Sequence, residues 1–153
     1  RESADPAAAM AAAVAHLARA ARSHAAVARH LEAAGFAADL VDTTVATLAA
    51  RGYVDDAALA ERRAEDLMLR RGAGRLKVAS ELTRRGLTDT VVDRAIAGVL
   101  EGQSEIALGR MALRRRFGDE LPASRAARAK AFRFLVGRGH PPEIVSEILG
   151  EDD

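Results

Sequence analysis

The side chains in this sequence that could do chemistry are clustered arginines and lysines, whose cationic groups bind phosphates and carboxylates. The run 70–77 holds four positive charges and no acid, and two arginines follow it; together they are Arg70, Arg71, Arg75, Lys77, Arg84 and Arg85. A second zone holds seven more: Arg114, Arg115, Arg116, Arg125, Arg128, Lys130 and Arg133. A solvated helix face also carries such charges, and Arg116 and Arg133 are open to a structural role. The recurrence of the clusters at matched places predicts one shared face for an anionic partner.

Groupings that would support catalysis are scarce. The sequence has no cysteine, which excludes disulfides, thiol nucleophiles and cysteine-ligated metals. His24 and His30 are six residues apart and so fall on different helix faces, and we expect the four histidines to be solvated or partly packed. The stretch Gly72-Ala73-Gly74 lacks the preceding strand and the third glycine of a dinucleotide site, and we interpret it as a turn between two helices. We therefore expect no enzyme, no metal and no cofactor.

The elements that position the charges are predicted to be helices. Alanine accounts for 36 of the 153 residues, and it is the best helix former and is depleted in strands. Large apolar side chains are few, so any core is thin. The composition predicts an all-α protein arranged as an elongated stack of small units.

Three helix ends recur around Gly35, Gly86 and Gly139, 51 and 53 residues apart. Each glycine is predicted to be the left-handed residue that ends a helix. Five apolar columns keep fixed offsets from these glycines: Val27/Val78/Ala131, Leu31/Leu82/Leu135, Leu40/Val91/Ile144, Val41/Val92/Val145 and Val45/Ile96/Leu149. The offsets predict three tandem three-helix repeats at 1–52, 53–102 and 103–153, with an extension at 1–5 and an acidic tail at the end. Generic helical-hairpin periodicity is the alternative.

Nine helices follow from the periodicity and the capping residues. They are expected at 6–21, 24–34, 38–50, 56–71, 74–85, 89–101, 105–117, 124–137 and 142–149. Asp55, Thr88 and Ser104 are predicted N-caps, Pro142 lies in a first turn, and Ala37 is a poor cap. The first helix of each repeat is expected to bury a stripe: Met10/Val14/Leu17/Ala21, Leu59/Ala60/Ala64/Leu67 and Ile106/Ala107/Met111/Leu113.

No apolar run approaches the ~20 residues of a membrane span, and residues 1–6 do not resemble a signal peptide. We expect a soluble cytoplasmic monomer. Because the sequence starts with Arg1, we also expect that some N-terminal residues precede it.

Three segments resemble the central motif of the RecX family: 52–56 (GYVDD), 69–74 (LRRGAG) and 81–87 (ELTRRGL). The resemblance spans about residues 10–149. RecX proteins are bacterial regulators of the RecA recombinase and are built from three tandem three-helix repeats. The sequence departs from the family where Ala57-Ala58-Leu59 replaces an acidic–basic–aromatic pattern and where His140 replaces a usual Phe.

The resemblance implies a non-enzymatic regulator that acts in homologous recombination, DNA repair and the SOS response. Such a protein binds the RecA–single-stranded-DNA filament and inhibits its ATP hydrolysis, growth and strand exchange. The basic residues named above are the predicted contacts, and those at 70–85 are expected to contribute more to binding than those at 114–133. A helix-turn-helix or sequence-independent DNA-binding protein is the alternative, although the chain has no Asn and one Gln for reading bases. A protein-binding scaffold with an apolar groove is a third class, which weak salt dependence would distinguish.

Overall fold

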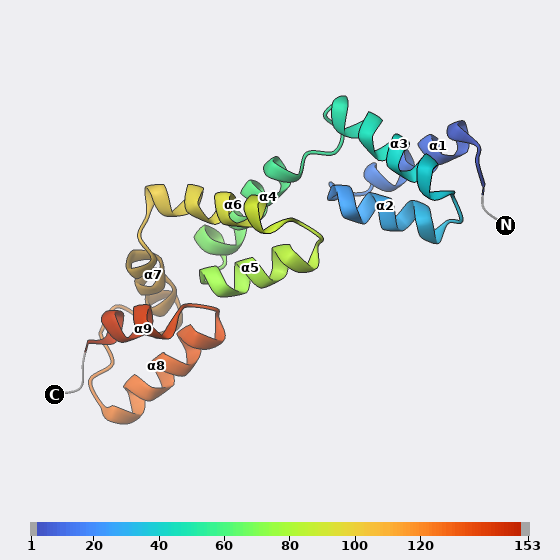
Figure 1. The fold of residues 1–153 in the computed structure, drawn as a ribbon. Coiled ribbons are helices and arrows are strands. Elements are labelled where there is room, and N and C mark those ends of the chain that lie inside the picture. The colour runs from blue at the N-terminus through green and yellow to red at the C-terminus, as the bar shows by residue number, and fades with distance from the viewer. Residues whose placement is uncertain (1–2, 151–153) are drawn as a thin grey trace.

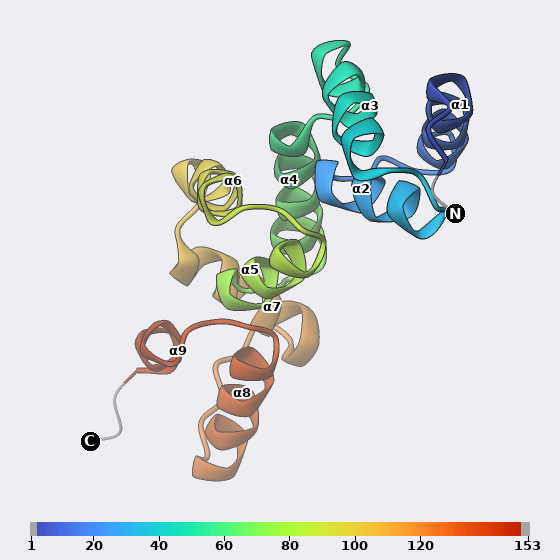
Figure 2. The ribbon, with the colours of Figure 1, turned by 45° about the vertical axis from the view of Figure 1, so that its right-hand side comes forward.

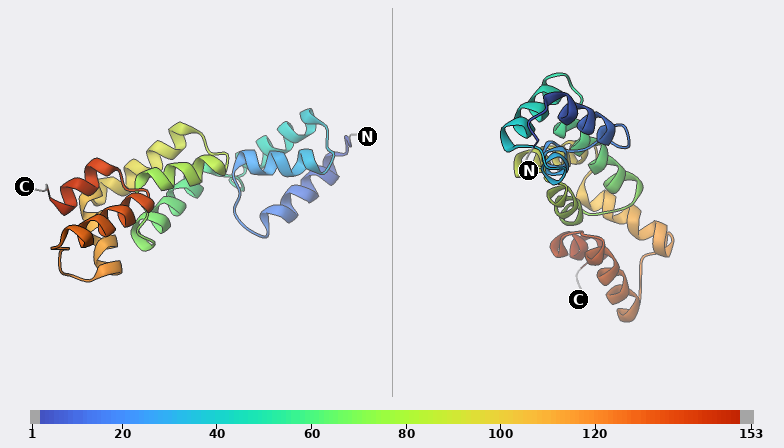
Figure 3. Two further views of the ribbon diagram at one scale, coloured as in Figure 1. Left: turned by 90° about the horizontal axis from the view of Figure 1, so that it is seen from below. Right: turned by 90° about the vertical axis from the view of Figure 1, so that its right-hand side faces the viewer.

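The computed structural model describes residues 3–150, which form an elongated row of three helical units (Figures 1 and 3). These residues contain nine α-helices: α1 (Pro6–Leu17), α2 (His24–Ala33), α3 (Ala38–Ala50), α4 (Asp56–Glu65), α5 (Arg75–Arg84), α6 (Asp89–Gly102), α7 (Glu105–Phe117), α8 (Arg125–Gly137) and α9 (Pro142–Leu149). The units follow one another along the chain, so the two ends of the chain lie at opposite ends of the row. The all-α repeat fold is therefore confirmed. Residues 1–2 of the predicted extension and the acidic tail 151–153 lie outside the described residues.

Most helices start at a side chain that accepts a backbone N–H. The predicted caps Asp55, Thr88 and Ser104 accept from the third residue beyond each of them, at 3.0, 3.4 and 3.1 Å. Ser23 and Ser124, which sequence reasoning did not single out, cap α2 and α8 in the same way. Ala37 has no side-chain cap bond, as predicted. Asp5 caps α1 with its side chain, whereas α5 and α9 start at Gly74 and Pro141 without a side-chain cap bond.

The three repeat glycines have left-handed backbone conformations, with φ of 93° at Gly35, 86° at Gly86 and 93° at Gly139. The residue after each glycine donates its N–H to the carbonyl five residues earlier, at 3.0–3.3 Å. These carbonyls belong to Leu31, Leu82 and Leu135. This is the Schellman ending, which satisfies carbonyls that the helix leaves unpaired. The predicted helix ends are confirmed.

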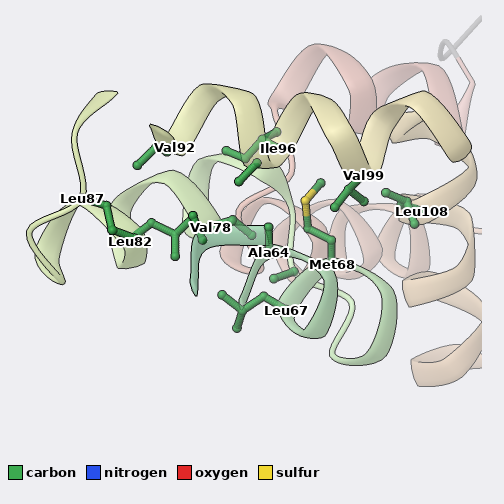
Figure 4. Close-up of a cluster of buried hydrophobic side chains, with 13 residues drawn as sticks. Ala64, Leu67, Met68, Val78, Leu82, Leu87, Val92, Ile96, Val99 and Leu108 are labelled. Carbon is green, nitrogen blue, oxygen red and sulfur yellow. The ribbon is translucent and has the colours of Figure 1, made fainter. Parts of the chain in front are cut away.

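Each unit has its own buried cluster, built on the predicted columns (Figure 4 shows the second). Leu31, Leu82 and Leu135 are each 0% exposed. The third column, Leu40/Val91/Ile144, is only half-buried in all three units. The fifth column fails in the third unit, where Ile148 is buried and Leu149 is half-buried. The boundaries predicted after residues 52 and 102 fall between helices, yet Val54 packs in the first cluster and Leu108 in the second. Neighbouring units therefore share their edges.

The first helix differs from its prediction in length and in facing. It ends at Leu17 instead of residue 21, because the exposed residues 18–21 have no packing that would outweigh an early turn toward α2. Its buried face consists of Ala9 and Ala13, while Val14 is 51% exposed. The predicted stripe was therefore wrong at Val14 and Ala21: small alanines face the neighbours, and the larger side chains line the edge of the contact.

The first helices of the other two units also differ in detail. The helix predicted at 56–71 is interrupted, since a π-helical turn, Asp66–Arg70, continues α4. Its expected stripe, including Leu67, is buried. On α7 the buried face is Leu108, Gly109, Ala112 and Leu113 in place of the predicted stripe, of which only Leu113 is buried. Gly109 explains the change, because a Cβ there would come within 2.3 Å of Ile148 Cδ1.

The units are joined twice by the same contact. The N-cap of α2, Ser23, donates its hydroxyl to the carbonyl of Arg85 at 2.6 Å. The N-cap of α5, Gly74, donates its N–H to the carbonyl of Arg138 at 2.9 Å. Arg85 and Arg138 occupy the same repeat position, directly before the left-handed glycine. Each unit therefore inserts the start of its second helix against the glycine turn of the next unit.

The corresponding turn of the first unit is covered by the N-terminal segment. Ser3 donates its N–H to the Gly35 carbonyl at 2.7 Å and accepts from the Ala37 N–H at 2.9 Å. Ser3 and Phe36 thereby form an isolated parallel bridge.

Candidate anion-binding interface

The two predicted basic zones meet at the junction between the second and third units. Arg115, on α7, donates Nη1 to the Arg70 carbonyl at 2.9 Å and Nη2 to the Leu69 carbonyl at 3.2 Å. Arg138, at the end of α8, donates to the Arg71 carbonyl. Both guanidiniums thus cover the C-terminal carbonyls of the π-helical turn, where the helix dipole is negative. Residues about 45 positions apart in the sequence therefore form one surface.

We call Arg70, Arg71, Arg115, Arg116 and Arg138 the junction cluster. Four of its members line a cavity of about 220 Å³, together with Gly72, Ala112 and Phe134. Asp66 offsets part of the charge, at 3.6 Å from Arg70 and 3.1 Å from Arg71. In the described part of the chain it is the only acid ion-paired with the cluster. Five guanidiniums against one carboxylate leave a strongly positive surface, and the side chains of Arg70 and Arg71 remain 81% and 60% exposed.

Other predicted residues of the second unit brace helices against one another. Arg75 contacts Glu105 at 2.7 Å and Glu143 at 3.9 Å, which ties α5 to the third unit. Arg85 contacts Glu81, whose stronger partner is Arg63 at 2.6 Å. Lys77 and Arg84 are exposed. The predicted set of residues 70–85 therefore divides into braced and solvent-facing charges.

The carboxyl of Glu81 shows how these braces work. Burial disfavours its ionisation, but the hydrogen bond and charge of Arg63, with help from Arg85 and Arg84, bring its pKa below the ordinary value. Glu81 therefore remains ionised and pairs with the guanidiniums of Arg63 and Arg85.

The junction cluster is held in place by a buried histidine. His140 is 2% exposed, and its Nε2 lies 3.0 Å from the Gly72 carbonyl. Burial lowers the pKa of His140, and Arg138 adds to this effect, while the Gly72 contact and Glu105 oppose it. The expectation of a solvated or partly packed histidine was wrong here, because the third unit encloses the ring. With its proton on Nε2, the neutral ring donates to the Gly72 carbonyl and links the two units.

The second predicted tier lies mainly on the third unit. Arg125, Arg128 and Arg133 line a groove of about 720 Å³ between α8 and α9, and Arg128 donates to the Gly150 carbonyl at 2.8 Å. Arg116 and Lys130 flank the Phe117 ring, 5.0 and 6.0 Å from its centroid.

The basic residues therefore gather at the junction and in the α8/α9 groove, while Arg114 is exposed on α7. Sequence reasoning did not single out Arg138, which belongs to the junction cluster, or Phe132, which lines the α8/α9 groove. For Arg138 the signal was its repeat position beside Gly139, and for Phe132 it was an aromatic next to Arg133.

Comparison with known proteins identifies the family. Family models described as RecX, second three-helix domain, and RecX, third three-helix domain, match residues 55–96 and 103–149. The chain belongs to the RecX family. The regulatory protein RecX of Chromobacterium violaceum is 32% identical over 117 residues, which cover 75% of this chain and 72% of the relative. The RecX protein of Chromohalobacter salexigens is 35% identical over 119 residues, covering 78% and 76%.

A solved structure agrees on the fold. The crystal structure of RecX from Lactobacillus salivarius superimposes with a TM-score of 0.78 over 94% of both chains, at 18% identity. Within residues 3–150, no helix is long and apolar enough to cross a bilayer. The same residues hold no group of three or more acidic or histidine side chains placed to bind a metal.

Proposed function

We propose that this RecX-family protein regulates the RecA recombinase by binding the RecA–single-stranded-DNA filament. Binding inhibits ATP hydrolysis, filament growth and strand exchange, and the protein itself catalyses no reaction. It acts as a monomer in the bacterial cytoplasm, in recombinational repair and the SOS response. The relatives described as regulatory proteins support this role.

The observation that carries the proposal is the junction cluster. Capping the π-helical turn uses Arg115 and Arg138, so Arg70, Arg71 and Arg116 exceed what that role needs. Because Gly74, Leu76 and His140 bond the second unit to the third, the cluster is pre-organised, which lowers the cost of binding. A pre-organised cationic surface on an elongated row suits a long anionic partner such as a nucleoprotein filament.

A base-reading helix-turn-helix protein is the weaker alternative. The helix after each glycine turn would be its recognition helix, and these are α3, α6 and α9. These three helices contain no Lys, Asn or Gln and one Arg, which is Arg94. Base edges are read mainly by such side chains. The positive charge lies instead at the junction and on α8.

The test measures inhibition of DNA-dependent ATP hydrolysis by RecA across a salt series. The variant Arg70→Gln/Arg71→Gln removes two exposed charges whose ion pairs within residues 3–150 are with Asp66 alone, so we expect the fold to remain intact. The matched control Arg62→Gln/Arg94→Gln removes two exposed charges of the same unit outside the cluster. We expect weaker inhibition and a shallower salt dependence for the first variant, and no change for the control. No effect of the parent protein on RecA would overturn the proposal.

A further inference from the structure

One aromatic ring of the third unit takes no part in the core. Phe117 and Phe134 pack edge to face, with ring centroids 5.4 Å apart, around the third cluster. Phe132, between them in sequence, belongs to no buried cluster and is 36% exposed. The chain has only four Phe and one Tyr, and the ring of Phe132 adds little to a thin core. Its exposed face is open to a ligand.

The ring lines the α8/α9 groove among cations. Arg125, Arg128, Phe132 and Arg133 come from α8, and Leu149 and Gly150 close the other side. Arg125 and Phe132 are seven residues apart, two turns along one helix face, so the charge and the ring are aligned along the groove. Within residues 3–150, Arg125 and Arg133 have no carboxylate partner in ion-pair contact. The groove thus offers the guanidiniums of Arg125 and Arg133 beside an exposed ring.

This combination matches one class of ligand. Guanidiniums bind backbone phosphates, and an exposed ring gives an unpaired base a surface on which to stack. A duplex keeps its base faces stacked internally, and an acidic peptide would use the arginines but not the ring. We propose that the α8/α9 groove binds a single-stranded nucleic acid, with phosphates on Arg125 and Arg133 and one base stacked on Phe132. The inference rests on and deepens the proposed function, since it assigns the single strand of the filament to a named groove.

The experiment uses the full chain without RecA and a fluorescently labelled oligothymidine, followed by anisotropy. A second oligomer of equal length carries abasic sugars, and a third is a duplex. Phe132→Ala should weaken binding of oligothymidine roughly 5- to 150-fold, the effect of losing one stacked base. It should not change binding of the abasic oligomer, because no base is present to stack. Arg125→Gln/Arg133→Gln should lower the slope of log affinity against log salt by about 0.7 for each lost contact.

Two controls separate stacking from general damage. Phe132→Trp keeps a stacking face and should bind at least as tightly as the parent protein. Leu121→Ala removes another exposed apolar side chain, 68% exposed in the loop before α8 and outside the groove, and should change nothing. Circular dichroism checks that each variant is folded. Equal affinity of Phe132→Ala and the parent for oligothymidine overturns the inference. Tighter binding of the duplex, or of a labelled acidic peptide titrated in the same way, also overturns it.

The result is separable from the proposed function. Inhibition of RecA by the parent, combined with unaltered oligothymidine binding by Phe132→Ala, refutes the groove and keeps the regulatory role. Ring-dependent oligothymidine binding by a parent protein that leaves RecA unaffected keeps the groove and refutes the regulatory role.

Discussion

The joint between the second and third units can be tested by one added methyl group. Gly74 has an ordinary negative φ of −85°, so alanine there carries no backbone strain. A Cβ would, however, lie 2.4 Å from the backbone carbon of Gly139 and from the backbone nitrogen of His140. Both obstacles are backbone atoms, so no side-chain rotation relieves the clash. Gly74→Ala must therefore push the third unit away from the second.

The magnitude follows from the bonds that the displacement breaks. The N–H groups of Gly74 and Leu76 donate to Arg138 and Gly139 at 2.9 and 3.0 Å, and each bond contributes about 0.5–1.5 kcal/mol. His140 would also lose Gly72, and a buried polar group left unpaired costs about 1–3 kcal/mol. We expect Gly74→Ala to lower the stability of the docked third unit by about 2–6 kcal/mol.

The assay combines calorimetry with hydrogen exchange. Melting should occur roughly 5 °C or more below the parent, and the Leu76 amide should lose protection. The control is Gly98→Ala on α6, where a Cβ would meet nothing within 4 Å. That variant should gain about 0.5–1 kcal/mol from helix propensity. A Gly74→Ala protein that melts with the parent and keeps Leu76 protected would refute the close contact between the units.

Three further predictions concern the turns, the joints and pH. A Cβ added at Gly35 would meet nothing within 4 Å, so Gly35→Ala isolates the cost of the left-handed conformation. We expect thermal unfolding to show a loss of about 1 kcal/mol in stability, and an unchanged melting temperature would contradict the assigned turn. Ser23→Ala removes both the α2 cap and the bond to Arg85, and denaturant titration should show a loss of about 1–2 kcal/mol, whereas Ser124→Ala should cost only a cap. Burial holds the pKa of His140 below its ordinary value, so the unfolded chain binds more protons than the folded chain as the pH drops below about 6.5, and the free energy of unfolding should fall. His140→Gln should flatten this pH dependence. An equal slope in both proteins would contradict the role assigned to His140.

The repeat and its helix ends could be predicted from sequence because they depend on local chemistry. Gly35, Gly86 and Gly139 end helices through a conformation that only glycine adopts without steric cost, and Asp55, Thr88 and Ser104 cap through their own side chains. These signals lie within a few residues of the feature they specify. The helix bounds were accordingly close, apart from the end of α1 and the π-helical turn.

The facing of helices and the meeting of distant residues depend on tertiary packing. Val14 and Ala13 are both apolar neighbours, and only the approach of α2 and α3 decides which one is buried. The contacts of Arg115 with Leu69 and Arg70 require the third unit to be docked, so sequence could identify two basic zones but not their union. The burial of His140 has the same origin.

The segment at Ser3 has a consequence for assembly. A contact in which each unit docks on the turn of the next is a rule for indefinite growth, and repeat proteins need terminal caps to stop it. Ser3 bonds to Gly35 as Leu76 bonds to Gly139, so it occupies the turn on which a further unit would dock. A second molecule approaching this end finds the Gly35 carbonyl and the Ala37 N–H already bonded to Ser3. The same joint can therefore organise the row without turning the protein into a polymer.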